Sequence, residues 1–90
     1  MDKLERARKQ INNIDAQIVK LFEQRMKAVE DVANYKLANN LPILDTSREK
    51  ALLEKNLSLC TDNKFKKYYP IVLEGFLKAS KLMQKELLKK

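Results

Sequence analysis

The chain has 90 residues and a net charge of +7, with one glycine, two prolines, one cysteine and no histidine. So few turn-forming residues exclude an all-β fold, and the abundance of strong helix formers such as Ala, Leu, Lys and Glu predicts an all-α chain. Ninety residues make one domain at most, and we expect it to span residues 1–90. A single Cys60 and no histidine exclude both an internal disulfide and a zinc site.

The positive charge is concentrated in the second half of the chain. Residues 46–90 carry 11 Lys or Arg against 5 Asp or Glu, whereas residues 1–45 carry 8 against 7. Such a field attracts nucleic acid, an anionic membrane or a small polyanion, and it does not choose among them. No basic-then-apolar signal segment opens the chain, and no apolar run approaches the roughly 20 residues of a membrane span. We therefore expect a cytoplasmic protein.

The first predicted element is a long helix. Apolar residues recur there at spacings of three and four, the period of a helix with one continuous apolar seam. This apolar seam consists of Leu4, Ala7, Ile11, Ile14, Ile18, Leu21, Ala28, Val32 and Tyr35. It predicts a helix over about residues 3–38, which stops before Pro42 because proline cannot continue a helix.

The length of this helix bears on assembly. A helix of about 35 residues is roughly 52 Å long, whereas a compact domain of this size is about 30 Å across. The helix therefore overhangs its own core, and part of its apolar seam needs cover from elsewhere. A second copy of the chain is the simplest source of that cover, so we expect a homodimer.

Two further helices are expected. Thr46 begins a capping-box pattern, and the apolar residues that follow predict a short helix over about 46–60. A polar turn separates it from a helix over about 67–88, whose first turn tolerates Pro70. Gly75, alone inside that helix, suggests a close approach of two helices. The expected fold is all-α, with one long, one short and one medium helix in each chain.

Arg25 interrupts the apolar seam. Positions 4, 11, 18, 25 and 32 read Leu, Ile, Ile, Arg and Val, so a guanidinium takes an aliphatic place. A buried charge is costly unless it is paired. An ion pair or a register-setting role would be the structural explanation, and a bound anion the functional one. Lys36 lies about 16 Å further along and only about 20° round the helix, so both cations face the same way.

Two polar groups on the later helices have ordinary structural explanations when each is taken alone. Asp45, Arg48 and Glu49 open the second helix, where the carboxylates would cap it and the arginine would be solvated. Ser80 and Gln84 lie one turn apart on the third helix, where they would form its polar edge. Neither group alone predicts a function.

Taken together, these residues resemble the all-helical (type II) chorismate mutases over nearly the whole chain. That family has a long first helix with an Arg near its start, an Arg near its middle and a Lys near its end. An Asp-x-x-Arg-Glu turn opens its second helix, and a Ser-x-x-x-Gln pair lies in its third. The eight matching positions, in order and at compatible spacing, are Arg8, Arg25, Lys36, Asp45, Arg48, Glu49, Ser80 and Gln84.

The resemblance implies an isomerase that rearranges chorismate to prephenate in phenylalanine and tyrosine biosynthesis. This Claisen rearrangement is unimolecular and pericyclic, so it needs no nucleophile, metal or cofactor. It needs the substrate held in its reactive pose and negative charge stabilised on the breaking ether oxygen. By resemblance, Arg25 and Arg8 of the partner subunit hold the two carboxylates, with Ser80 assisting. Lys36 and Gln84 donate to the ether oxygen.

The resemblance also assigns the remaining residues and the assembly. Glu49 and the backbone at Asp45 take the ring hydroxyl, and Arg48 braces the site. The family arrangement is an interlocked homodimer with two sites, each completed by the other chain's Arg8.

Three alternatives stay open. An isochorismate pyruvate-lyase shares this fold and cationic pocket, but there the residue after the second-helix arginine tends to be apolar, whereas here it is Glu49. A non-catalytic module binding nucleic acid through the basic residues 64–90 would need interleaved stacking side chains, and the few aromatics mostly cluster near the turn. A plain coiled coil would leave Arg25 unpaired. We therefore expect a small dianionic substrate, and neither nucleic acid nor membrane as a partner.

Overall fold

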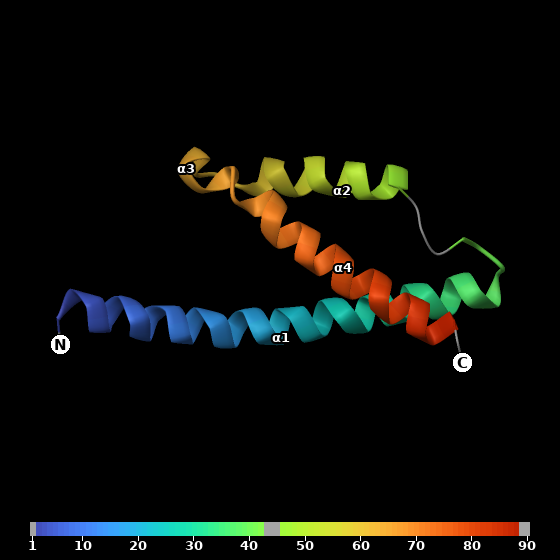
Figure 1. Cartoon of the computed structure of the whole chain (residues 1–90), viewed down its shortest axis with the longest axis horizontal. Coiled ribbons are helices and arrows are strands. Elements are labelled where there is room, and N and C mark those ends of the chain that lie inside the picture. The colour runs from blue at the N-terminus through green and yellow to red at the C-terminus, as the bar shows by residue number, and fades with distance from the viewer. Residues whose placement is uncertain (1, 43–45, 89–90) are drawn as a thin grey trace.

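The computed structural model describes residues 2–42 and 46–88, and within these ranges it contains helices and no strand (Figure 1). The prediction of an all-α chain is confirmed. The helices in chain order are α1 (Lys3–Ala38), α2 (Thr46–Leu59), α3 (Asn63–Lys66) and α4 (Tyr69–Leu88). In Figure 1, α2 runs back above α1, and α4 descends between them to cross the second half of α1.

Both ends of α1 follow from local chemistry. At its start, the Asp2 carboxylate accepts a hydrogen bond from the backbone N–H of Glu5 at 2.8 Å, which satisfies one free donor of the first turn. At its end, Asn40 takes a left-handed conformation with φ of 55°, which asparagine tolerates better than most residues. The backbone N–H of Leu41 then donates to the carbonyl of Lys36 at 2.8 Å, closing a Schellman motif.

The described chain has four helices where the sequence predicts three. The addition is α3, a single turn that forms because the Asp62 side chain accepts from the backbone N–H of Lys64 at 2.9 Å. The last helix accordingly begins at Tyr69 rather than near residue 67. Among the described residues of the single chain, the close helix approach expected at Gly75 is not seen, because a Cβ atom added there would meet no neighbour within 4 Å.

Helix α4 packs against each of the other three helices, and the core that results is small. Among the described apolar side chains, only Ala33 and Leu73 are buried. Phe22 of α1 and Phe76 of α4 add a stacked pair with ring centroids 6.2 Å apart. A single chain therefore buries little of its apolar surface.

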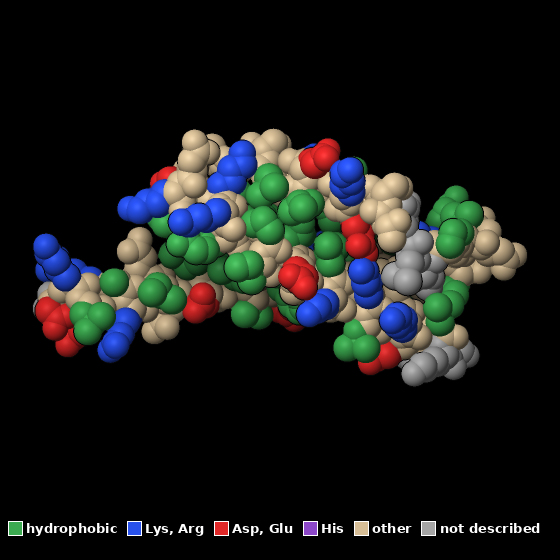
Figure 2. Space-filling model, turned by 45° about the horizontal axis from the view of Figure 1, so that its top comes forward, with side chains coloured by type: hydrophobic (Ala, Val, Ile, Leu, Met, Phe, Trp, Pro, Cys, Tyr) green, Lys and Arg blue, Asp and Glu red, His purple; other side chains and the backbone are tan. Residues whose placement is uncertain are grey.

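The first half of α1 projects beyond the rest of the molecule. Every residue from 2 to 21 is exposed, and Figure 2 shows apolar side chains open to solvent on this projection. The radius of gyration is 16.5 Å, against about 12 Å for a compact chain of this length. The accessible surface is 7667 Å², against about 5,400 Å² for an ordinary monomer of this mass. Among the described helices, none combines the length and apolar character that a membrane crossing requires.

Candidate active site

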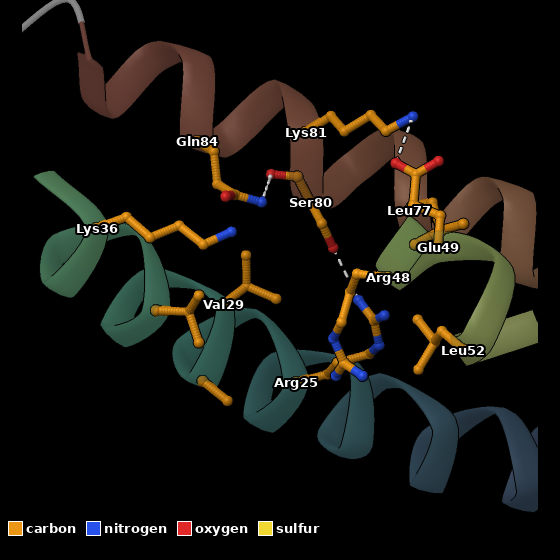
Figure 3. A pocket seen from close by; sticks show the side chains of 12 residues that line it. Arg25, Val29, Lys36, Arg48, Glu49, Leu52, Leu77, Ser80, Lys81 and Gln84 are labelled. Carbon is orange, nitrogen blue, oxygen red and sulfur yellow. Dashed lines mark hydrogen bonds and ion pairs between the residues drawn. The ribbon is translucent and has the colours of Figure 1, made fainter. Parts of the chain in front are cut away.

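A cavity of about 350 Å³ lies between the second half of α1, the start of α2 and the second half of α4 (Figure 3). This volume lies within the range of pockets that hold small molecules, about 300–1,000 Å³. Its apolar walls come from all three helices and consist of Ala28, Val29, Val32, Leu52 and Leu77. The three helices thus form a site that is apolar around a few polar groups, as small-molecule sites usually are.

The polar lining includes six of the eight predicted site residues, which are Arg25, Lys36, Arg48, Glu49, Ser80 and Gln84. Arg8 does not join them: it lies on the projecting half of α1, 17 residues before Arg25, or about 25 Å along the helix axis. Asp45 lies outside the described residues. The roles that the sequence assigns to these side chains stay predictions.

Arg25 is held by neutral groups. Its Nη1 donates to the Ser80 hydroxyl at 2.7 Å, and its guanidinium carbon lies 5.6 Å from the centre of the Phe76 ring. No carboxylate of the described residues forms an ion pair with it, so the expected structural explanation of an ion pair is not met there. A guanidinium has five N–H donors, and one bond to a hydroxyl leaves most of them for an anion.

Ser80 and Gln84 are not a solvated polar edge. Ser80 is only 6% exposed, and its hydroxyl both accepts from Arg25 and donates to the Phe76 carbonyl at 2.8 Å. The Gln84 amide donates to the Ser80 carbonyl over a long 3.3 Å, and its Oε1 is buried without a hydrogen-bond partner. A buried polar atom left unpaired is costly. Gln84 therefore has an unpaired acceptor oxygen, Oε1, beside the cavity.

The cavity is strongly cationic. Among the described residues, Arg25, Lys36, Arg48 and Lys81 line it, and Glu49 is their acidic companion. In Figure 3 the Lys36 side chain extends from α1 into the space below Gln84. Such a cluster attracts and orients anions. Among the described residues, no group of His, Cys, Asp and Glu side chains could hold a metal ion.

Lys81 is the charged cavity-lining residue that was not predicted from the sequence. Its ammonium lies 2.7 Å from a carboxylate oxygen of Glu49, joining α4 to α2. One signal for it was available, because Lys81 precedes Gln84 by three residues, a spacing that puts both on one helix face. Nothing in the sequence indicates that α2 lies opposite that face.

Comparison with known proteins identifies the family. The model of the chorismate mutase type II family matches residues 7–85. The chain belongs to this family. The resemblance to the all-helical chorismate mutases that the sequence predicts is therefore confirmed. No solved structure gives a significant match.

Named relatives fall into two kinds. One is a bifunctional chorismate mutase/prephenate dehydratase of Buchnera aphidicola subsp. Schizaphis graminum, 43% identical over 84 residues, which are 92% of this chain and 22% of that protein. The other is a chorismate mutase of Methanocaldococcus jannaschii, 32% identical over 89 residues, which are 98% of this chain and 90% of that protein. The chain thus spans about a fifth of the length of the bifunctional relatives, and nearly all of the shorter one.

Proposed function

We propose that this chain is a chorismate mutase, an isomerase that rearranges chorismate to prephenate for aromatic amino acid biosynthesis. The observation that carries the proposal is the convergence of Arg25, Lys36 and Gln84 on one cavity in a chain of this family. Chorismate is a dianion with two carboxylates, a ring hydroxyl and an enol ether. A cationic cavity with apolar walls suits both its charge and its ring.

The carboxylates are the first requirement, because holding them fixes the side chain of chorismate over its ring. Arg25 is suited to one of them, since Ser80 and Phe76 already fix its guanidinium. A preorganised donor loses little freedom when the substrate binds. Arg48, from α2, braces the same space.

The ether oxygen is the second requirement, because negative charge develops on it as its C–O bond breaks. Lys36 and Gln84 reach the cavity from α1 and α4 and would donate to this oxygen from two sides. Fixed donors aimed at developing charge accelerate a reaction without any proton transfer. The long 3.3 Å bond from the Gln84 amide nitrogen to the Ser80 carbonyl supports this role, since a weakly held N–H is available to a ligand oxygen.

The ring hydroxyl is the third requirement. Glu49 is the one described carboxylate among the cavity lining, and it would accept a hydrogen bond from that hydroxyl. The backbone of Asp45, outside the described residues, would assist. A location in the cytoplasm stays a prediction.

The proposal includes an interlocked homodimer in which Arg8 of the partner subunit completes each site. Arg8 lies about 25 Å from Arg25 along α1, so it cannot reach the cavity of its own chain. The exposed apolar seam supports a second copy as cover, since Leu4, Ile11, Ile14 and Ile18 are each 45–56% exposed. Burial of such side chains is the main force for association.

The test is loss of chorismate absorbance with formation of prephenate, assayed beside isochorismate. Lys36→Met should lower kcat by about 10²-fold or more, as loss of an oxyanion donor does. Lys27→Met is the matched control, because it lies nine residues away on the opposite face of α1 and does not line the cavity. Full turnover in Lys36→Met, with intact helicity, would remove Lys36 from the mechanism.

Two other outcomes would replace the proposal. Pyruvate release from isochorismate, without turnover of chorismate, would make the chain an isochorismate pyruvate-lyase. Retention on DNA that falls steeply with salt, without either activity, would favour a basic binding module.

A further inference from the structure

Glu49 is an anomaly in a cavity proposed to bind a dianion. Arg25, Lys36 and Arg48 line the same cavity. A carboxylate beside these cations can pair with them, and it then competes with the carboxylates of the substrate. An acceptor for the ring hydroxyl is useful only if that competition is prevented.

The contact between Glu49 and Lys81 is built differently from an ordinary surface ion pair. It joins α2 to α4 at 2.7 Å, and the two side chains are 28% and 39% exposed. Lys78, one turn earlier on α4, pairs with Glu74 within the same helix at 3.7 Å, with side chains 78% and 67% exposed. Short, partly buried pairs are less screened than exposed ones, so Lys81 is the stronger restraint on its partner.

The pair also occupies a particular position. Glu49, Leu77 and Lys81 line the proposed active site, and the same three residues also line a second cavity of about 530 Å³. They therefore form the wall between the two cavities. Figure 3 shows the Lys81 side chain reaching along α4 to Glu49 at one side of the site, away from Lys36 and Gln84.

We propose that Lys81 is a positioning residue that holds the Glu49 carboxylate at this wall and keeps it off the cations of the active site. The inference rests on the proposed function and deepens it. It explains how one cavity contains an acceptor for a hydroxyl and still accepts a dianion. Lys81 itself need not touch the substrate.

The expected effects are specific to the pair. In Lys81→Met the released carboxylate pairs with the cavity cations, so affinity for a dianion falls by about 10-fold, allowing for partial exposure. Glu49→Gln should weaken binding by itself, because it replaces the proposed acceptor for the ring hydroxyl, so it serves as the background in which Lys81→Met is measured again. In that background Lys81→Met should cost less than about threefold, since no carboxylate remains there to compete for the cations.

The experiment measures the dissociation constant of prephenate by calorimetry, together with KM and kcat for chorismate. The variants are Lys81→Met, Lys81→Gln as a second neutral change, Lys81→Arg, Glu49→Gln and the double variant. Lys81→Arg should bind nearly as well as wild type, and KM should move more than kcat in Lys81→Met. Lys78→Met is the matched control, because it removes one charge from the same helix and should leave affinity unchanged.

Two outcomes would overturn the inference. One is wild-type affinity in both neutral variants. The other is a loss from Lys81→Met that is as large in the Glu49→Gln background as in the wild-type background, as independent charges would give, which would mean that Lys81 attracts the ligand by its own charge.

The same measurements distinguish failure of the proposed function from failure of the role of Lys81. A wild-type protein that binds prephenate yet leaves chorismate unchanged, while Lys81→Met costs less in the Glu49→Gln background, would overturn only the proposed activity. A wild-type protein that converts chorismate, while Lys81→Met costs as much in the Glu49→Gln background as in wild type, would overturn only the role of Lys81. A protein that neither binds nor converts overturns both.

Discussion

The two halves of α1 share one sequence pattern and have different surroundings. In both, apolar residues recur at spacings of three and four. In the second half α4 packs beside that face, so that Ala33 is fully buried and Arg25 reaches Ser80, although Val32 and Tyr35 of the apolar seam remain 49% and 64% exposed. In the first half every residue from 2 to 21 is exposed. Periodicity therefore dictates that a helix forms and which face is apolar, whereas what covers that face depends on partners remote in sequence or in another chain.

The largest expected effect comes from breaking the uncovered half. Ile14 belongs to the apolar seam and is 45% exposed in the single chain. In a two-fold dimer Ile14→Glu would bury two charges at once, and a buried unpaired charge is strongly destabilising. We expect loss of the dimer in analytical ultracentrifugation and activity at background.

The control for this change is its neighbour. Asn13→Glu adds the same charge about 100° round the helix, away from the apolar seam, and should leave mass and activity intact. A fully active, dimeric Ile14→Glu would show that the first half of α1 is not an interface.

The next largest effect concerns Gln84, which lies on α4, the helix that packs against the second half of α1. A glutamate at position 84 can donate to the ether oxygen only when it is protonated, and free glutamate has a pKa near 4.3. Gln84→Glu should therefore lose about 10²-fold in kcat at neutral pH and regain activity as the pH falls. The wild-type chain, which has no histidine, should have a broad profile across neutral pH. A variant with the same broad profile would count against Gln84 as the donor.

The smallest expected effect is a partial recovery of activity in a heterodimer. It tests whether Arg8, from the first half of α1, and Arg25, from the second half, act in one site. If each site uses Arg25 of one chain and Arg8 of the other, the Arg8→Ala and Arg25→Ala homodimers should both be nearly inactive. A heterodimer of the two has one site with both arginines and one with neither. Random reassortment gives about half heterodimers, so roughly a quarter of all sites should recover.

This measurement requires co-refolding, because interlocked chains exchange slowly on simple mixing. Differential tags would confirm that heterodimers are present. Activity that stays at the homodimer background in confirmed heterodimers would show that Arg8 does not act across the interface.

Local rules explain what the sequence predicted about the fold. The ends of α1 at Lys3 and Ala38 follow from Asp2 as a cap and from the asparagines before Pro42. The turn α3 escaped prediction because it rests on one capping bond of Asp62, a residue equally typical of an open turn. The close approach expected at Gly75 is not met within the single chain, and the sequence could not decide it because the neighbours of a helix glycine are set by tertiary packing.

The site residues divide in the same way, into those that spacing along the chain predicts and those that depend on contacts between helices. Spacing along α1 brought Arg25 and Lys36 to one face, and the family pattern supplied their companions. Contacts between helices were beyond such reasoning: Arg25 and Ser80 are 55 positions apart, and Lys81 meets Glu49 only because α4 lies beside α2. From the sequence alone, a lysine that pairs with another helix cannot be distinguished from a lysine that is exposed to solvent.

The nearly absent core of the single chain has a thermodynamic consequence. Ala33 and Leu73 are the only buried apolar side chains among the described residues, so in the proposed homodimer folding and association should be one equilibrium. The midpoint of thermal unfolding should then rise with protein concentration, as it does for obligate dimers. On dilution, specific activity should fall together with helicity, because a separated chain loses its fold along with the arginine of its neighbour.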